Sequence, residues 1–227
     1  MLRTTGVSIV IPTWNEESNI GKVIREVKRL LERYGYPYEV IIVDRYSADR
    51  TVRVARSLGA RVLYDTAGKG AALIKGFKAA RHKVVISMDA DLSNRPNELL
   101  LLIAGIEAGY EICAGSRFLT GGGSDDMPWH RKAGNKFFVT LVNLMYRSRY
   151  TDMCYGYRSF TSGALRRLGL VEKGFGIETE INIKAAKKQM RVLEVPSFEK
   201  PRAKGAGKLH TWRDGYAILR VIIKNAL

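Results

Sequence analysis

Three aspartates directly follow apolar runs of the sequence, where a parallel sheet would place its ligand. Asp44 follows the run 40–43, and Asp89 and Asp91 follow the run 84–88. Because the carboxyl ends of parallel strands meet at one edge, we expect these carboxylates to converge there. Asp89 and Asp91, one residue apart, have the spacing to hold a hard divalent cation whose other ligands are substrate phosphates. The sequence therefore predicts a metal site; the alternative for Asp91 is a cap of the next helix.

Basic residues clearly outnumber acidic ones. The chain has 38 Lys and Arg against 22 Asp and Glu, a net charge of +16, and residues 184–227 hold half of it with 11 basic and 3 acidic groups. Four of these basic groups lie in a segment with Pro and Gly, namely Lys200, Arg202, Lys204 and Lys208. Such a segment either binds phosphate or is a solvated surface. The overall charge indicates nucleic acid, an anionic membrane or phosphorylated small molecules as partners.

Several other chemistries are excluded by their missing motifs. The pattern GxxxxGK[ST] is absent, and Gly68-Lys-Gly70 lacks the third glycine of a dinucleotide fingerprint. There is no GxSxG motif, and the three histidines are scattered without metal-ligand spacing. Cys113 and Cys154 form neither a disulfide framework nor a zinc cluster, which favours a reducing compartment.

The elements that must position these residues alternate between strand and helix in the first half of the chain. Short β-branched runs predict strands, and apolar residues at helical spacing predict helices between them. The strands are expected at 7–12, 38–43, 61–64, 84–88 and 111–115, and the helices at 16–33, 49–58, 69–80 and 96–108. This alternation predicts right-handed βαβ units and a mostly parallel sheet.

After Arg117 the alternation ends. We expect helices at 131–147, 178–189 and 212–226 and a strand at 192–195. The chain is predicted to be a single domain, residues 1–227, in which 1–116 bind a ligand and 117–227 receive its partner. No apolar segment is long enough to span a bilayer, and the run 7–12 is too short for a signal peptide. A cytoplasmic protein, soluble or peripheral on the cytoplasmic face of the membrane, is expected.

Seven motifs in order resemble the inverting family 2 glycosyltransferases of the GT-A fold. They run from residue 6 to about 215, and the resemblance is greatest to the polyprenyl-phosphate glycosyltransferases, which include the dolichol-phosphate mannose synthases. The motifs are Val7-Ser-Ile-Val-Ile-Pro-Thr-Trp-Asn-Glu-Glu17, Val43-Asp44-x-x-Ser47-x-Asp49-x-Thr51, Gly68-Lys-Gly70, Asp89-Ala-Asp91, Gly115-Ser-Arg117, Asp152-x-x-x-Gly156-x-Arg158 and Arg202-x-x-Gly205-x-x-Lys208. The resemblance implies a Rossmann-like three-layer α/β sandwich, a nucleotide-diphospho-sugar transferase fold.

The resemblance also implies roles for individual residues. Mg²⁺ or Mn²⁺ would be held by Asp91, with Asp89 touching the ribose or the metal. The donor-binding set would be Pro12, Trp14, Glu16, Asp44, Lys69, Asp89, Ala90, Arg202 and Lys208, with Asp44 reading the base edge. Arg117 and Arg131 would contact an acceptor phosphate. Asp152 would be the base for a hydroxyl acceptor, or else a structural partner of Arg158.

Three positions depart from the family pattern. Arg45 stands where relatives often have a second aspartate, Ser93 where they have glutamine, and Gly207 where they have serine. The identity of the base and the class of the acceptor therefore stay open.

The function expected is transfer of glucose or mannose from UDP-glucose or GDP-mannose to a polyprenyl or dolichyl phosphate. The lack of a spanning helix up to Leu227 favours a soluble hydroxyl acceptor instead, such as a phosphorylated glycerate or a glycan, whereas Arg117 with Arg131 favours a phosphate. Helices at 131–147 and 212–226 have apolar faces bordered by basic residues, and they are expected to contact an anionic membrane surface. The alternative, expected for most of their apolar residues, is packing on the sheet. A basic nucleic-acid-binding module is a remote alternative, because aromatic residues are not interleaved with the basic ones. No nucleic-acid partner is expected.

Overall fold

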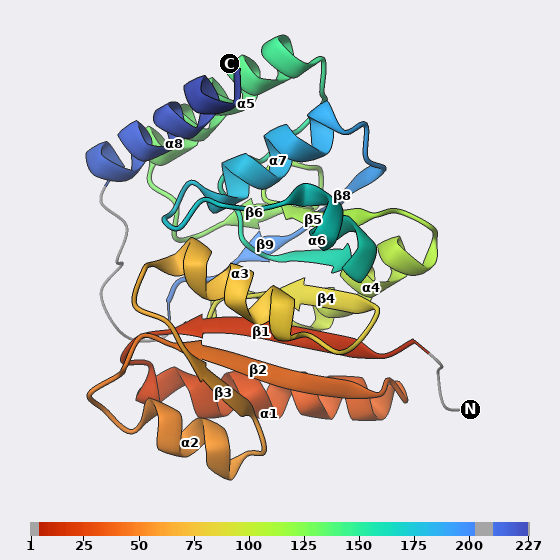
Figure 1. Ribbon diagram of the computed structural model, residues 1–227, viewed down its shortest axis with the longest axis vertical. Helices are drawn as coiled ribbons and strands as arrows, with labels where there is room; N and C mark the ends of the chain where they lie inside the picture. The colour runs from red at the N-terminus through yellow and green to blue at the C-terminus, as the bar shows by residue number, and fades with distance from the viewer. Residues whose placement is uncertain (1–4, 203–210, 227) are drawn as a thin grey trace.

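A seven-stranded, mostly parallel sheet forms the centre of the molecule (Figure 1). In the computed structural model, residues 5–202 and 211–226 are described. The strands are β1 (Val7–Thr13), β2 (Tyr38–Asp44), β3 (Arg61–Tyr64), β4 (Val84–Ser87), β5 (Ile112–Ser116), β7 (Arg158–Thr161) and β8 (Val192–Pro196). Their order is β3-β2-β1-β4-β7-β5-β8, and β7 runs antiparallel to both neighbours. A second, two-stranded sheet pairs β6 (Gly123–Ser124) with β9 (Phe198–Glu199).

Helices cover both faces of the large sheet (Figure 1). One face carries α1 (Glu17–Arg33), α2 (Thr51–Ser57) and, after the 3₁₀ turn Pro96–Glu98, α4 (Leu99–Glu107). The other carries α3 (Lys69–Ala79), α6 (Ser162–Leu168) and α7 (Ile177–Lys187). Two further helices, α5 (Trp129–Tyr146) and α8 (Thr211–Ala226), pack outside α7. The predicted three-layer α/β class is therefore confirmed, with a partial fourth layer.

The buried strand β1 explains why the two faces are covered. Its Ile9 and Ile11 pack with α1, whereas the intervening Val10 packs with α3 on the opposite face. Successive side chains of a strand point to opposite faces, so a strand buried on both sides needs a continuous apolar run. The matching stripe on α1 recurs every three or four residues, from Ile20 to Leu31.

The second half of the chain contains elements that the sequence analysis did not predict, namely β6, β7, α6 and β9. Strand β7 lies between β4 and β5 even though it begins with a buried arginine, Arg158. The side chain of Arg158 is satisfied locally by hydrogen bonds to the carbonyl of Tyr155 (2.7 Å) and to Asn182. A buried charge with such partners is tolerated in a strand, but it gives no apolar signal in the sequence.

The sheet brings the predicted site residues to one edge. Thr13 is paired with Asp44 at the ends of β1 and β2, and β4 ends at Ser87, opposite Val10 of β1. Because β7 is antiparallel, its first residue Arg158 is opposite both Ser87 and Ala114. The segment before β7 therefore arrives at the same edge at which β4 and β5 end. This edge is called the rim below.

Candidate active site

One end of the rim is a rigid pair of loops after β1 and β2. Asp44 is fully buried, and its carboxylate accepts hydrogen bonds from Thr13 Oγ1 (2.8 Å), Ser47 N (2.7 Å) and Ser47 Oγ (2.6 Å). Asn15 and Ser47 link the loops, since Asn15 N donates to Ser47 Oγ and Asn15 Oδ1 accepts from Ala48 N. The carboxylate at position 44 thus fixes the conformation of both loops.

Aromatic side chains are presented by this same end of the rim. The guanidinium of Arg45 lies over the ring of Trp14, with its Cζ atom 4.8 Å from the centroid, and Trp14 is 40% exposed. Tyr46 and Tyr64 stack with their centroids 4.8 Å apart. Exposed flat rings beside a fixed loop are suited to stacking with a nucleotide base.

The other predicted residues of β1 and its loop are also at the rim. Pro12 lies in β1 opposite Val43 and is half-buried. Glu16 precedes α1, where its carboxylate accepts a hydrogen bond from Asn19 Nδ2 (2.9 Å) and its backbone N–H donates to Thr51 Oγ1 (2.7 Å). In the sequence each lies two residues from Trp14.

Lys69 links two carboxylates in the middle of the rim. Its Nζ atom lies 3.0 Å from Asp89 Oδ1 and 3.0 Å from Glu178 Oε1, and we call these three residues the Lys69 triad. Burial disfavours the charged ammonium, but the two carboxylates raise the pKa of Lys69 well above its ordinary value. Burial likewise opposes ionisation of Asp89, but Lys69, with smaller contributions from Arg202 and Arg117, holds the pKa of Asp89 below its ordinary value. Lys69 and Asp89 therefore both carry charge near neutral pH.

The motif Gly68-Lys69-Gly70 packs against the protein's own backbone. A Cβ atom at position 68 would lie 2.5 Å from the carbonyl oxygen of Lys173, and one at position 70 would lie 2.2 Å from that of Glu172. Gly68 also has a φ of 126°, which favours glycine. The glycines let the start of α3 approach the loop before α7, which places Lys69 beside Glu178.

Arg202 is the second cation shared by two carboxylates. Its Nη1 atom lies 3.0 Å from Asp91 Oδ2, and its Nε atom lies 3.8 Å from Asp126 Oδ2. Asp91 is buried, and its other oxygen accepts a hydrogen bond from Ser93 N (3.1 Å). Asp91 thus forms a local turn and an ion pair, and the helix-capping alternative is wrong because α4 and its preceding turn show no side-chain cap.

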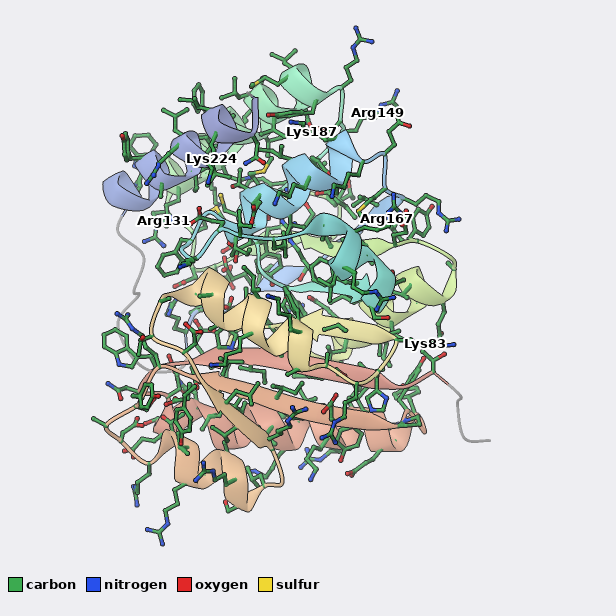
Figure 2. All side chains as sticks on the ribbon, viewed as in Figure 1. Lys83, Arg131, Arg149, Arg167, Lys187 and Lys224 are labelled. Atoms are coloured by element: carbon green, nitrogen blue, oxygen red, sulfur yellow. The ribbon has the colours of Figure 1, made fainter. Side chains whose placement is uncertain are left out.

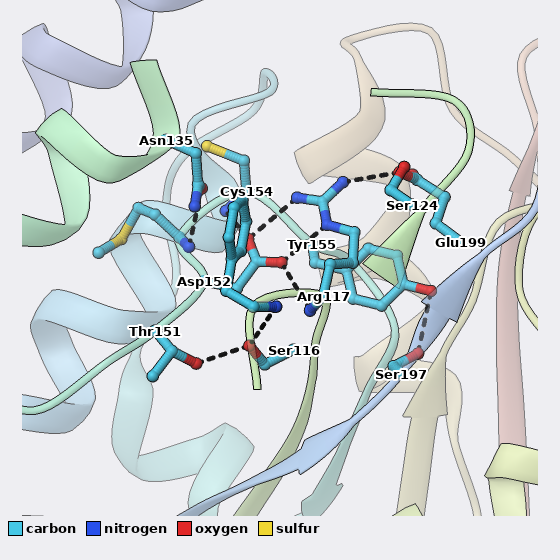
Figure 3. A network of polar contacts seen from close by, with 12 residues as sticks. Ser116, Arg117, Ser124, Asn135, Thr151, Asp152, Cys154, Tyr155, Ser197 and Glu199 are labelled. Carbon is cyan, nitrogen blue, oxygen red and sulfur yellow. Dashed lines mark hydrogen bonds and ion pairs between the residues drawn. The ribbon is translucent and has the colours of Figure 1, made fainter. Parts of the chain in front are cut away.

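Arg117 is the third cation that is shared by two carboxylates (Figure 3). Its Nε and Nη2 atoms form a bidentate pair with Asp152, at 2.7 and 2.9 Å, and its Nη1 atom lies 3.0 Å from Glu199 Oε2. The guanidinium also lies over the ring of Tyr155, 4.6 Å from its centroid. Both Arg117 and Asp152 are buried. Asp152 therefore pairs with Arg117. The alternative partner, Arg158, instead donates hydrogen bonds to the carbonyl of Tyr155 and to Asn182.

The rim therefore has a repeated electrostatic pattern: each of three cations is shared by two carboxylates. Ion pairs join Lys69, Arg117 and Arg202 to Asp89, Asp91, Asp126, Asp152, Glu178 and Glu199. Among the residues that the structure describes, these six carboxylates against three cations leave an excess of negative charge, although the chain as a whole is strongly basic. Such a site has the electrostatics to receive a further cation.

The donor set of Asp89 and Asp91 fits a hard divalent ion. Both are carboxylates, and carboxylate oxygens suit Mg²⁺ or Mn²⁺, which commonly take one or two from the protein and the rest from substrate phosphates and water. Among the residues that the structure describes, no group of three or more His, Cys, Asp or Glu side chains is arranged to hold a metal. A third protein ligand is therefore not indicated within this part of the chain.

The remaining predicted residues are placed as follows. Arg131 lies in the first turn of α5, which is tied to the Asp152 segment by a hydrogen bond from Met153 N to Asn135 Oδ1 (3.0 Å; Figure 3 shows Asn135 beside Asp152). Ala90 is buried between the two aspartates of its motif. Lys208 lies outside the described residues.

Three residues of this site were missed by sequence reasoning: Asp126, Glu178 and Glu199. Each pairs with a cation 76 or more positions away, as the numbering of the Arg202, Lys69 and Arg117 pairs shows. No motif in the sequence signalled them.

The sheet order and the charged rim define an enzyme fold of the GT-A type, and comparison with known proteins agrees. The model of the family "Glycosyl transferase family 2" matches residues 8–169. The chain is 35% identical to a dolichol-phosphate mannosyltransferase of Pyrococcus furiosus over 211 residues, covering 89% of this chain and 59% of that protein. It is 31% identical to a dolichyl-phosphate hexose transferase of Haloferax volcanii, covering 97% of this chain and 94% of that protein.

The chain belongs to glycosyl transferase family 2, and it is a glycosyltransferase. The fold is also shared with glucosyl-3-phosphoglycerate synthase from Mycobacterium tuberculosis, which was solved with Mn²⁺, UDP and glucosyl-3-phosphoglycerate. The TM-score is 0.74 and the sequence identity 19%, and the match covers 98% of this chain and 80% of that one. The chain spans less than two thirds of the Pyrococcus relative.

Proposed function

We propose that the enzyme transfers a hexose from a nucleotide diphosphate sugar to a polyprenyl phosphate, with Mg²⁺ or Mn²⁺ as its metal. The observation that carries this proposal is the state of Asp152, which is buried and engaged by both sides of the Arg117 fork. A hydroxyl acceptor needs a general base, and a carboxylate clamped by arginine is a poor one. A phosphate acceptor is already an anion and needs only positioning and charge compensation.

The donor would lie along the rim from the aromatic rings to the carboxylates. Its base would stack near Trp14, with Pro12, Glu16 and Asp44 shaping that end, and its diphosphate would lie at the end of β4. Asp89 and Asp91 would hold the metal, which supplies positive charge to the departing nucleoside diphosphate. Arg202 and Lys208 would add donors to the same diphosphate, where charge develops in the transition state.

The acceptor phosphate would lie on the opposite side of the sugar, near Arg117 and Arg131. Three of the five N–H groups of Arg117 are used by Asp152 and Glu199. An acceptor oxygen would form a bond to the anomeric carbon as the bond from that carbon to the diphosphate breaks. Attack from the face opposite the leaving group inverts the configuration. In this proposal residues 1–116 bind the donor and residues 117–227 the acceptor.

A lipid acceptor requires contact with a membrane, and the outer layer of α5 and α8 is suited to provide it. No helix among the described residues has the length and hydropathy needed to cross a bilayer. On α5, however, Trp129, Phe137 and Leu144 are 80%, 59% and 75% exposed, and on α8 Tyr216 and Ile223 are 71% and 55% exposed. Figure 2 shows Lys224 on α8, Lys187 on α7 and Arg149 just after α5 in the same part of the molecule.

These apolar and basic side chains would lie on an anionic membrane surface. Other residues of the two helices, such as Val142 and Ile222, are buried in a cluster with Ile183 of α7. We expect the protein to cosediment with vesicles that contain anionic lipid, less so at high salt, and not with neutral vesicles. Binding that is absent, or that does not change with salt, would contradict this part of the proposal.

The central experiment supplies the enzyme with Mn²⁺, a polyprenyl phosphate and either labelled GDP-mannose or labelled UDP-glucose, followed by extraction into organic solvent. Label should enter the organic phase only when lipid phosphate is present, and the active donor identifies the base and the sugar. A matched reaction with the free polyprenol tests whether the acceptor phosphate is required. Release of nucleotide with all label left in water would instead indicate a soluble acceptor.

A further inference from the structure

Glu178 is a buried carboxylate beside the rim for which the proposed reaction has no direct use. It lies in the first turn of α7, is 4% exposed and forms the far end of the Lys69 triad. Through Lys69 it is connected to Asp89, so an ion-paired chain runs from α7 across α3 to the end of β4. The two N–O separations are equal at 3.0 Å, which places the ammonium between the two carboxylates.

The backbone around this chain is closely packed at three glycines. Gly68 and Gly70 hold the start of α3 against the carbonyl oxygens of the loop before α7. On the other side, a Cβ atom at Gly156 would lie 3.1 Å from both Glu178 Oε1 and Lys69 Nζ. A lysine side chain normally has much rotamer freedom. Here the ammonium is held between the carboxylates of Asp89 and Glu178.

We propose that Glu178 is a positioning residue for the metal site, acting through Lys69 on Asp89. This inference rests on the proposed role of Asp89 toward the metal. With Glu178 present, the triad carries two negative charges and one positive charge, so Lys69 fixes the orientation of Asp89 without neutralising it. Without the charge of Glu178, Lys69 would pair one to one with Asp89. A cation would then have to compete with the ammonium for that carboxylate.

The test measures binding of Mn²⁺ to the full chain, with GDP or UDP present, by the loss of the free-ion signal in electron paramagnetic resonance. The readout does not depend on turnover. Partners outside the metal's own ligands affect metal affinity by about 10- to 100-fold, and we expect Glu178→Gln to raise the Kd for Mn²⁺ by about tenfold. The matched control is Glu39→Gln, which removes a half-buried carboxylate paired with Arg61 at the far end of the sheet. It should leave the Kd within about twofold of that of the parent protein.

Two further variants separate positioning from the general effect of charge. Glu178→Asp keeps the charge but shortens the side chain, so it should weaken Mn²⁺ binding nearly as much as Glu178→Gln. In a Lys69→Met background, Glu178→Gln should have no further effect, because residues that act through one another are not additive. Circular dichroism and thermal melting establish that each variant is folded.

Three results would overturn the inference: an unchanged Kd in Glu178→Gln, parent-like binding by Glu178→Asp, or additive effects in the Lys69→Met background. If the parent protein itself binds no Mn²⁺ in the presence of either nucleotide, the metal assignment of the proposed function fails and this inference fails with it. Parent-like binding by the Glu178 variants overturns this inference alone.

Discussion

Replacing Asp152 by asparagine tests the choice between a phosphate acceptor and a hydroxyl acceptor. The substitution keeps the size of the side chain and one oxygen, but it puts an amide NH₂ where a carboxylate oxygen now accepts a bond from Arg117. Removing one partner of a buried ion pair typically costs 3–5 kcal/mol. Because Glu199 stays paired with Arg117 and one of the two guanidinium hydrogen bonds to residue 152 survives, we expect a loss of about 3 kcal/mol. At about 2–4 °C per kcal/mol for a chain of this size, the melting temperature should fall by about 6–12 °C.

The Asp152→Asn substitution should change the rate of turnover only mildly. If Asp152 only holds Arg117, kcat at saturating acceptor should fall by less than about tenfold, with the larger change in the KM for polyprenyl phosphate. Loss of a general base would instead lower the rate by about 10²–10⁴. The measurements are thermal melting and steady-state kinetics below the new melting temperature. The control is Asp125→Asn, because Asp125 is exposed. A variant with parent-like stability and a thousandfold lower kcat would refute our reading of Asp152 and, with it, the argument for a phosphate acceptor.

Three further predictions concern other parts of the structure. Trp14→Ala should weaken nucleotide binding by about tenfold, as loss of a base-stacking ring does; calorimetry showing unchanged affinity would place the base elsewhere. Gly156→Ala should lower stability by about 1–3 kcal/mol and weaken Mn²⁺ binding, because its Cβ would lie 3.1 Å from two charged atoms of the Lys69 triad; a parent-like variant in both assays would show that the triad is loosely held. Burial raises the pKa of the Cys113 and Cys154 thiols to about 12. Below the ordinary thiol pKa of 9.0 both the folded and the unfolded protein keep these protons, so the shift does not affect stability. Above pH 9 the unfolded protein loses protons that the folded protein keeps. The free energy of unfolding should therefore fall as the pH rises from 9, by about 1 kcal/mol per thiol at pH 10. Denaturant titrations should show this slope reduced in a variant with alanine at both cysteines, and an equal slope would contradict it.

The parallel part of the fold could be predicted from the sequence because its signals are local. The β1 run from Val7 and the stripe on α1 are contiguous or periodic, and they need no knowledge of distant residues. Strand β7 has no such signal. It starts at Arg158, whose burial is compensated only when Asn182 and the carbonyl of Tyr155 come together in the fold. Short bridges such as β6 with β9 likewise depend on tertiary contacts rather than on propensity.

The candidate site, like the fold, could be predicted from the sequence only in part. Asp89, Asp91 and Asp44 could be placed at the rim because each follows an apolar strand. Their actual neighbours could not be predicted, since ion pairs such as Lys69 with Glu178 join residues more than one hundred positions apart. The sequence motifs therefore name both partners in three of the ion pairs, and in the other three the fold supplies the carboxylate.

The antiparallel strand β7 has a consequence for how the two halves of the chain depend on each other. It is the hydrogen-bonded neighbour of both β4 and β5, which do not pair with each other. A fragment that ended at residue 116 would therefore contain β4 and β5 without the strand that lies between them. Their facing edges would have unpaired backbone groups, a condition that favours aggregation. Residues 1–116 cannot complete their own sheet, so they should fold cooperatively with the half of the chain that follows them. Limited proteolysis in the segment between β5 and β7 should accordingly leave two pieces that remain associated until they unfold together.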